Sequence, residues 1–143
     1  MASVATTSPG YRSQPGRLHT LLLAGTVPLF LGALLSDIAY FKTYQIQWSN
    51  FASWLLAGAE LFCGLALLAA LVNLVRAQRK SGPVVLYFLL LLATFVLGLV
   101  NCFQHAKDAW AVMPAGMVMS VIVFLLSVLA AWVGLAPRTG GLQ

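Results

Sequence analysis

Four apolar segments, each about as long as a membrane-spanning helix, dominate this sequence and limit what it can fold into. They run over residues 18–40, 52–75, 83–103 and 113–135. Since a helix needs ~20 mainly apolar residues to cross the hydrocarbon core of a bilayer, each segment has the length of one crossing. None of them alternates between apolar and polar residues as the strands of a membrane barrel do. The sequence therefore predicts an all-α integral membrane protein with a four-helix transmembrane bundle.

The composition excludes a soluble domain of this length. Of the 143 residues, 61% are apolar and 8% are charged, whereas soluble domains carry about 25% charged residues. We expect a polar tail at residues 1–17, the transmembrane domain at 18–135 and a short tail at 136–143. The first apolar segment does not fit a cleaved signal peptide, because it is long, contains Asp37 and lacks a cleavage pattern of small residues.

The basic residues are divided unevenly between the two sides of a four-pass topology. One side would hold Arg12, Arg17, Arg76, Arg79, Lys80 and Arg138, and the other Lys42 and Lys107. Basic residues concentrate on the cytoplasmic side of membrane proteins. Both termini are therefore predicted to be cytoplasmic, and the net charge of +5 needs no nucleic acid as a partner.

Small and polar residues recur at intervals of three or four in each segment, which places them on one helix face. Such faces let helices approach closely in lipid, so we expect them to form the inside of the bundle. The four faces are Gly25, Pro28, Gly32 and Ser36; Glu60, Cys63 and Gly64; Thr94, Gly98, Asn101 and His105; and Gly116, Ser120, Ser127, Ala131 and Gly134. Residues 41–51 are predicted to be an outer loop, with Tyr44 and Trp48 as interfacial anchors.

The same topology gathers polar side chains in the outer third of the bundle. They are Asp37, Glu60, Asn101, His105, Lys107 and Asp108. One interpretation is a structural lock between helices, in which Asp37 or Glu60 pairs with His105 or Lys107. The other is a polar pocket open to the periplasm, with Glu60 as its deepest titratable group. We expect His105 to turn inward toward a carboxylate, because buried carboxylates need a donor and few others lie at that depth.

Catalytic and metal-binding signatures are absent from the sequence. It contains no Walker loop, GxGxxG sequence, zinc-type spacing or Ser-His-Asp set, so we expect no enzymatic activity and no bound metal. Haem held between two histidines is not expected, because His19 and His105 belong to opposite surfaces, roughly 30 Å apart. Haem ligation by His105 with Met113 or Met117 stays an alternative. His19 itself is expected to be an interfacial side chain.

Three stretches of the sequence resemble a known family. They are LHTLLLAGTVPLFLGALLSDIAY, WSNFASWLLAG and NCFQHAKDAWAVMPAG. They resemble the predicted bacterial inner-membrane proteins of domain of unknown function 2231, over residues 18–135, although the family often has His-Pro where this chain has His19 followed by Thr20. The resemblance implies the fold and a bacterial inner-membrane location, and the family has no established activity. Some relatives look to be encoded beside periplasmic sugar dehydrogenases or fused to redox domains, which would imply a partner in electron transfer.

Three hypotheses on function follow. The first is a non-enzymatic scaffold or accessory subunit, whose polar cluster faces the periplasm and whose outer surface docks a periplasmic partner. The second is a redox membrane protein that binds quinone or haem and receives electrons from a periplasmic dehydrogenase. The third is a small proton-coupled carrier that uses Glu60, although the two halves of the chain lack the repeat of interrupted helices found in many carriers.

Overall fold

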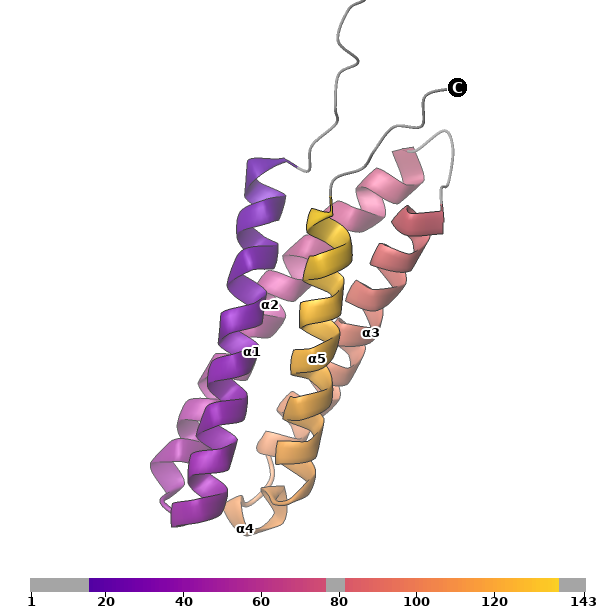
Figure 1. Cartoon of the computed structure of the whole chain (residues 1–143). Helices are drawn as coiled ribbons and strands as arrows, with labels where there is room; N and C mark the ends of the chain where they lie inside the picture. Colours follow the sequence, from indigo (N-terminus) through magenta and orange to yellow (C-terminus); the bar gives the residue numbers. More distant parts are fainter. Residues whose placement is uncertain (1–15, 77–81, 137–143) are drawn as a thin grey trace, which may run out of the picture.

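The computed structural model describes residues 16–76 and 82–136, which form five α-helices. They are α1 (Arg17–Thr43), α2 (Ile46–Arg76), α3 (Gly82–His105), α4 (Ala109–Val112) and α5 (Ala115–Leu135). All of these except α4 are long and apolar enough to cross a membrane. The described residues therefore confirm the predicted bundle of four spans, which run side by side in alternating directions (Figure 1).

The spanning helices pack as a ring. α1 packs on α2 and α5, and α3 also packs on α2 and α5, so that α1 and α3 lie diagonally across the bundle. At the connection end, the lower end in Figure 1, lie the α1–α2 turn and α4. At the terminal end α1 begins and α5 ends. The expected tails fall largely on residues 1–15 and 137–143, which lie outside the described residues. Residues 77–81 also lie outside them, as do Arg12, Arg79, Lys80 and Arg138.

The predicted loop over residues 41–51 is wrong, because the two helices extend into it from both sides. Tyr44 and Gln45 are the residues between α1 and α2. Tyr44 ends α1 in the left-handed conformation, with φ 54° and ψ 20°, and its N–H donates to the carbonyl oxygen of Tyr40 at 2.7 Å. This is a helix C-cap. α2 begins early because Ser49 and Ala52 continue its buried face at helical spacing.

A seven-residue repeat of buried positions runs through the helices. In α2 the repeat comprises Ser49, Ala52, Leu56, Ala59, Cys63, Ala66 and Ala70, in α3 Tyr87, Leu91, Thr94, Gly98, Asn101 and His105, and in α5 Gly116, Ser120, Val123, Ser127, Ala130 and Gly134. A strict seven-residue repeat keeps the same face of a helix against the neighbouring helices when the helices pack with a left-handed twist. The predicted polar stripe of α3 is confirmed. In α5 the buried position is Ala130, while Ala131 is half-buried.

The contact between α1 and α2 depends on small residues, as expected for helices in lipid. A Cβ built on Gly25 would lie 3.7 Å from the Phe62 ring, and one on Gly32 would lie 3.1 Å from Leu55. Large side chains of α2 therefore pack directly against these two glycines. Pro28 belongs to another side of α1, where it is exposed, and the helix continues through it.

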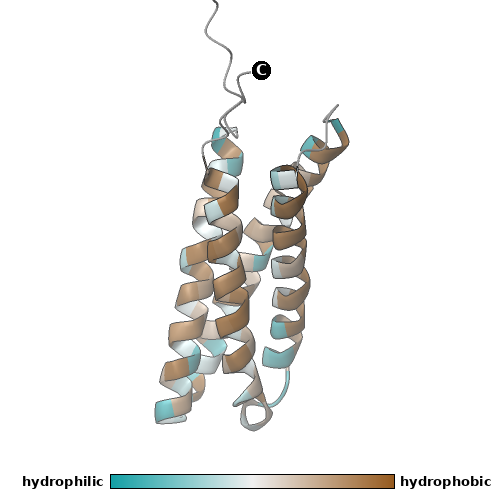
Figure 2. Ribbon diagram, turned by 45° about the vertical axis from the view of Figure 1, so that its right-hand side comes forward, coloured by the Kyte–Doolittle hydropathy of each residue, from teal (hydrophilic) through white to brown (hydrophobic). Residues whose placement is uncertain are grey.

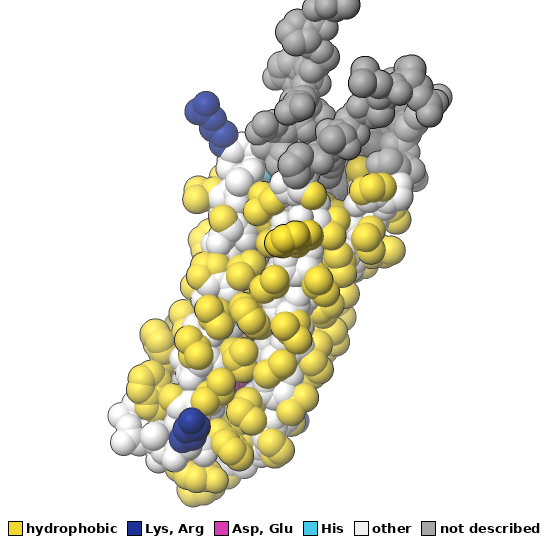
Figure 3. Space-filling view, viewed as in Figure 1, with side chains coloured by type: hydrophobic (Ala, Val, Ile, Leu, Met, Phe, Trp, Pro, Cys, Tyr) yellow, Lys and Arg dark blue, Asp and Glu magenta, His cyan; other side chains and the backbone are white. Residues whose placement is uncertain are grey.

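The outside of the bundle is apolar between its two ends. Apolar side chains cover the visible face (Figure 3), and hydrophobic residues dominate the ribbons along most of their length (Figure 2). Leu21, Trp54 and Trp132 are 67%, 78% and 78% exposed. A surface of this kind would be unstable in water and suits lipid. The protein is therefore a multi-pass membrane protein.

Candidate functional site

A buried polar network at the connection end joins three helices around Asp37. Asp37 of α1 is fully buried, and each of its carboxyl oxygens has a hydrogen-bond partner on another helix. Oδ1 lies 2.8 Å from Nε2 of His105 in α3, and Oδ2 accepts a hydrogen bond of 2.5 Å from the Ser120 hydroxyl in α5. The inward orientation expected for His105 is confirmed, with Asp37 as the carboxyl group it meets.

His105 and Asp37 share a proton whichever side chain carries it. Nδ1 of His105 lies 3.0 Å from the carbonyl oxygen of Asn101, which can act only as an acceptor, so Nδ1 must donate there. Nε2 then either donates to an ionised Asp37 or accepts from a neutral one. The pair is neutral overall in both arrangements. It therefore avoids the cost of an isolated charge at this depth.

Ser120 is a member of the network that sequence reasoning placed on the helix face but not in the cluster. Its hydroxyl donates to Asp37 and accepts a hydrogen bond of 2.8 Å from Nδ2 of Asn101. One turn earlier, Gly116 lets the His105 ring approach, since a Cβ there would lie 3.0 Å from Cε1 of that ring. The signal that could have found Ser120 is its place in the seven-residue repeat, one turn after a glycine.

Glu60 is a second buried carboxyl group, and the structure places it apart from this network. It is the fifteenth of the 31 residues of α2 and is 6% exposed. A Cβ built on Gly98 would lie 1.7 Å from its Oε1, so the Glu60 carboxyl group fills the space that Gly98 leaves. Gly98 precedes His105 by two helical turns, about 10 Å along α3. Neither Glu60 oxygen has a hydrogen-bond partner among the described residues.

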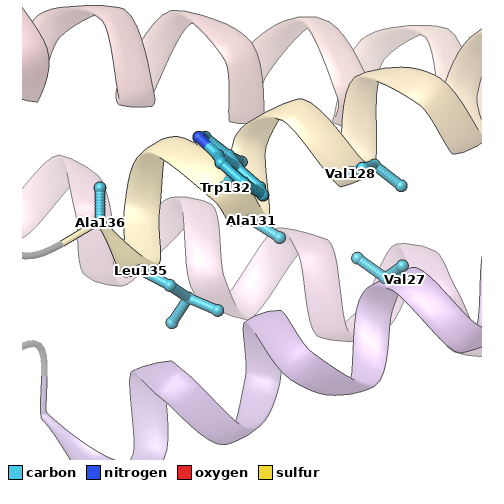
Figure 4. Close-up of a pocket in the computed structure, with 6 residues that line it drawn as sticks. All are labelled: Val27, Val128, Ala131, Trp132, Leu135 and Ala136. Atoms are coloured by element: carbon cyan, nitrogen blue, oxygen red, sulfur yellow. The ribbon is translucent and has the colours of Figure 1, made fainter.

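Two grooves run along the outside of the bundle, and they differ in chemistry. The α1–α5 groove, of about 460 Å³, is apolar throughout its lining of Val27, Val128, Ala131, Trp132, Leu135 and Ala136, apart from the Trp132 ring nitrogen (Figure 4). The α2–α3 groove, of about 550 Å³, is lined by Ala57, Glu60, Leu61, Gly64, Leu65, Leu67, Leu68 and Phe95. A carboxyl group with no partner in the described part of the chain thus borders an otherwise apolar groove.

The other two expected cluster residues lie on the surface of the connection end. Lys107 is exposed and donates to Oε1 of Gln104 at 2.6 Å. Asp108 is also exposed and precedes α4 without a side-chain capping bond. The structure therefore brings Asp37, Asn101 and His105 together, and leaves Glu60, Lys107 and Asp108 outside their network.

Aromatic residues order the surface of this end. The Tyr40 hydroxyl donates to the carbonyl oxygen of Ala109 at 3.1 Å, which ties α1 to α4. Tyr44 and Trp110 stack with their ring centroids 6.4 Å apart. Trp110 is nevertheless 84% exposed. The connection end is thus held together internally and presents aromatic rings outward.

His19, at the terminal end, is buried rather than exposed at the membrane surface. Its Nε2 lies 2.6 Å from the Tyr87 hydroxyl of α3. Tyr87 in turn packs on Gly134 of α5, where an added Cβ would lie 2.5 Å from its ring. The expected snorkelling position is therefore wrong. The reason is that the Tyr87 hydroxyl on α3 offers the imidazole a hydrogen-bond partner inside the bundle, and Gly134 on α5 leaves space for the Tyr87 ring.

The family model described as "Predicted membrane protein (DUF2231)" matches residues 16–137. The chain belongs to this family. The DUF2231 match covers every described helix, so both the Asp37 network and Glu60 lie within the family domain. No curated protein and no solved structure matched the chain.

Proposed function

We propose that this protein is a non-enzymatic accessory subunit or scaffold of the bacterial inner membrane, with both termini in the cytoplasm and the connection end in the periplasm. In this role the connection end docks a periplasmic redox protein or dehydrogenase. The observation that carries the proposal is the internal use of Asp37. Both of its oxygens are engaged with hydrogen-bond partners from α3 and α5, in a site from which solvent is excluded.

A carboxyl group used in this way supports rigidity rather than chemistry. A catalytic acid or base must reach a substrate within hydrogen-bond distance, and Asp37 is fully buried. The network instead fixes α1, α3 and α5 against one another below the surface. The exposed residues Trp110 and Lys107 therefore belong to a rigid surface. Such a surface suits residues that anchor a partner, because a preorganised surface loses less entropy on binding.

Site-specific photo-crosslinking in cells tests the docking role. A photoreactive amino acid at position 110 should crosslink to a periplasmic redox protein or dehydrogenase. The matched control is position 132, since Trp132 is similarly exposed but lies near the terminal end. It should give crosslinks to lipid. Lipid crosslinks from both positions, without protein, would contradict the proposal.

The redox alternative divides into haem and quinone, and the geometry treats them differently. Both ring nitrogens of His105 are engaged, with Asp37 and Asn101, so this histidine would have to leave the network to ligate haem iron. An absorption spectrum of the purified protein tests this alternative, since haem ligation predicts a Soret band. A quinone needs no histidine, and the position of Glu60 in the lining of the apolar α2–α3 groove favours it.

A further inference from the structure

We propose that the α2–α3 groove is a binding site for a lipid-soluble ring that carries a carbonyl or hydroxyl oxygen, the chemistry of quinones and hydroquinones, with Glu60 as its polar contact. The inference goes beyond the scaffold role and does not depend on it. It rests on three features of the same place: an apolar groove, a buried carboxyl group that borders it, and the lack of any described partner for that group.

Burial of the Glu60 carboxyl group without a described hydrogen-bond partner is costly. Buried polar groups nearly always have hydrogen bonds, and an exception calls for an explanation. In the same protein the other buried carboxyl group, Asp37, has a partner for each oxygen. The contrast shows that this bundle can satisfy a carboxyl group with its own side chains. Neither oxygen of Glu60 has such a partner among the described residues.

The shape of the site favours Glu60 as a fixed contact. Gly98 behind it leaves space for the carboxyl group itself, since a Cβ there would overlap with Oε1. Gly64, one turn after Glu60, is covered by the Phe95 ring, whose nearest atom would lie 3.0 Å from an added Cβ. The groove therefore offers a carboxyl group and an aromatic ring within about one helical turn. A flat ring with an oxygen substituent matches both.

The groove opens between α2 and α3 on the outside of the bundle, where the exposed side chains Leu61, Leu65 and Leu68 suit contact with lipid. A ligand that reaches it must therefore dissolve in the membrane. A neutral molecule fits better than a cation, because a cation would bring a charge into the bilayer and require Glu60 to ionise there, at a desolvation cost on both sides. A carboxylic acid has one donor and free acceptor positions, which suit a carbonyl or a hydroxyl.

Dicyclohexylcarbodiimide, a lipid-soluble reagent for protonated carboxyl groups, provides the first readout. The acid O–H adds across one C=N bond of the reagent without a leaving group, and the O-acylisourea rearranges to a stable N-acylurea that mass spectrometry locates. In the full chain, reconstituted in phospholipid nanodiscs, we expect the adduct on Glu60 and its loss in Glu60→Gln. Asp37 should stay unmodified as an internal control. A lack of reaction at Glu60 would overturn the proposal, since the groove would then give no access from lipid.

The second readout is protection by a ligand, with a decyl-tailed benzoquinone as the probe. At about ten times its Kd, a competing ligand leaves about a tenth of the sites free, so modification of Glu60 should slow about tenfold. Decane, which has the tail without the ring oxygens, should not protect. Equal rates with and without the quinone would overturn the proposal. Protection by tetraphenylphosphonium in place of the quinone would also overturn it, in favour of a cation site.

A pair of variants ties the effect to the groove without altering Glu60. Ala57 and Ala136 are both exposed, and they line the α2–α3 groove and the α1–α5 groove respectively. Ala57→Leu should slow modification of Glu60 and weaken protection by the quinone, whereas Ala136→Leu should change neither. Because both positions face outward, both variants should fold. If Ala57→Leu behaved as Ala136→Leu does, the ligand would not occupy this groove and the proposal would fail.

Discussion

Asp37 of α1 and His105 of α3 are 68 residues apart in the sequence, and their side chains meet at 2.8 Å inside the connection end. At the terminal end His19 and Tyr87, which also belong to α1 and α3, meet at 2.6 Å. These two helices lie diagonally in the ring and pack mainly on α2 and α5. Polar contacts at both ends therefore join α1 and α3 across the diagonal, where their backbones pack less closely. We call the contact of Asp37 with His105 the connection-end brace and the contact of His19 with Tyr87 the terminal-end brace.

Removing the His105 imidazole from the connection-end brace should destabilise the bundle. His105→Leu leaves an Asp37 oxygen without its partner, at a cost of about 1–3 kcal/mol in the free energy of unfolding. Ser120→Ala removes two hydrogen bonds, one to Asp37 and one from Asn101, and at an average of about 0.6 kcal/mol per bond between membrane helices it should cost about 1.2 kcal/mol. Unfolding in detergent measures both. Gln104→Ala, which removes a surface contact with Lys107, is the control, and a His105→Leu protein as stable as this control would contradict the brace.

The two braces should act independently. Residues 19 and 37 are separated by about 27 Å along α1 at 1.5 Å per residue, and distant sites add within about 0.5 kcal/mol. Tyr87→Phe removes the hydroxyl that meets His19 and should cost about 0.6 kcal/mol, whereas Tyr44→Phe, at an exposed tyrosine, should cost nothing measurable. The double variant Tyr87→Phe and His105→Leu should lose the sum of the two single effects. A large deviation from that sum would show that the braces are coupled through the bundle.

Sequence reasoning predicted the spans because apolar length and helical spacing are local properties of the chain. The α3 stripe from Thr94 to His105 is an example, since intervals of four, three and four already define a face. The position of the α1–α2 turn could not be predicted in the same way. Trp48 and Phe51 suit an interfacial loop as well as a helix, and the choice depends on the burial of Ser49 and Ala52, which composition does not reveal.

The membership of the polar network was only partly accessible from sequence, because it depends on rotation and depth across helices. The direction of each helix places Asp37 and His105 at the same end. It does not reveal that Ser120 donates a hydrogen bond to the other oxygen of Asp37. Nor does it separate Glu60 from the network, because that requires the early start of α2 at Ile46 and the contact of Glu60 with Gly98.

The orientation of the bundle in the membrane is testable with fused reporters. Because Arg17 and Arg76 lie at the terminal end, together with the sequence positions of Arg79 and Lys80 between α2 and α3, we expect that end to be cytoplasmic. A reporter fused after Gln143 should be active in the cytoplasm. A reporter inserted at the α1–α2 turn should be active in the periplasm. The reverse result for both fusions would reverse the sidedness of the proposed docking surface.

Glu60 and Gly98 should show a strong coupling in a double-variant cycle. Gly98→Ala places a methyl group 1.7 Å from the present position of Glu60 Oε1, so the carboxyl group must move or the helices must separate. Overpacking of this kind typically costs about 1–3 kcal/mol. Gly58→Ala is the matched control, because its Cβ would meet Leu29 at an ordinary 3.8 Å, and we expect it to be close to neutral.

Shortening the acid should relieve the clash. In a Glu60→Ala background the space beside residue 98 is empty, and the nearest atom then is Cζ of Phe30 at 3.4 Å from the added Cβ. Gly98→Ala should therefore cost less in that background than in the wild type, with a coupling free energy within the range of about 0.5–3 kcal/mol found for residues in contact. Detergent unfolding of the four proteins in the cycle measures it. If Gly98→Ala cost the same in both backgrounds, the Glu60 carboxyl group would not occupy the space beside Gly98.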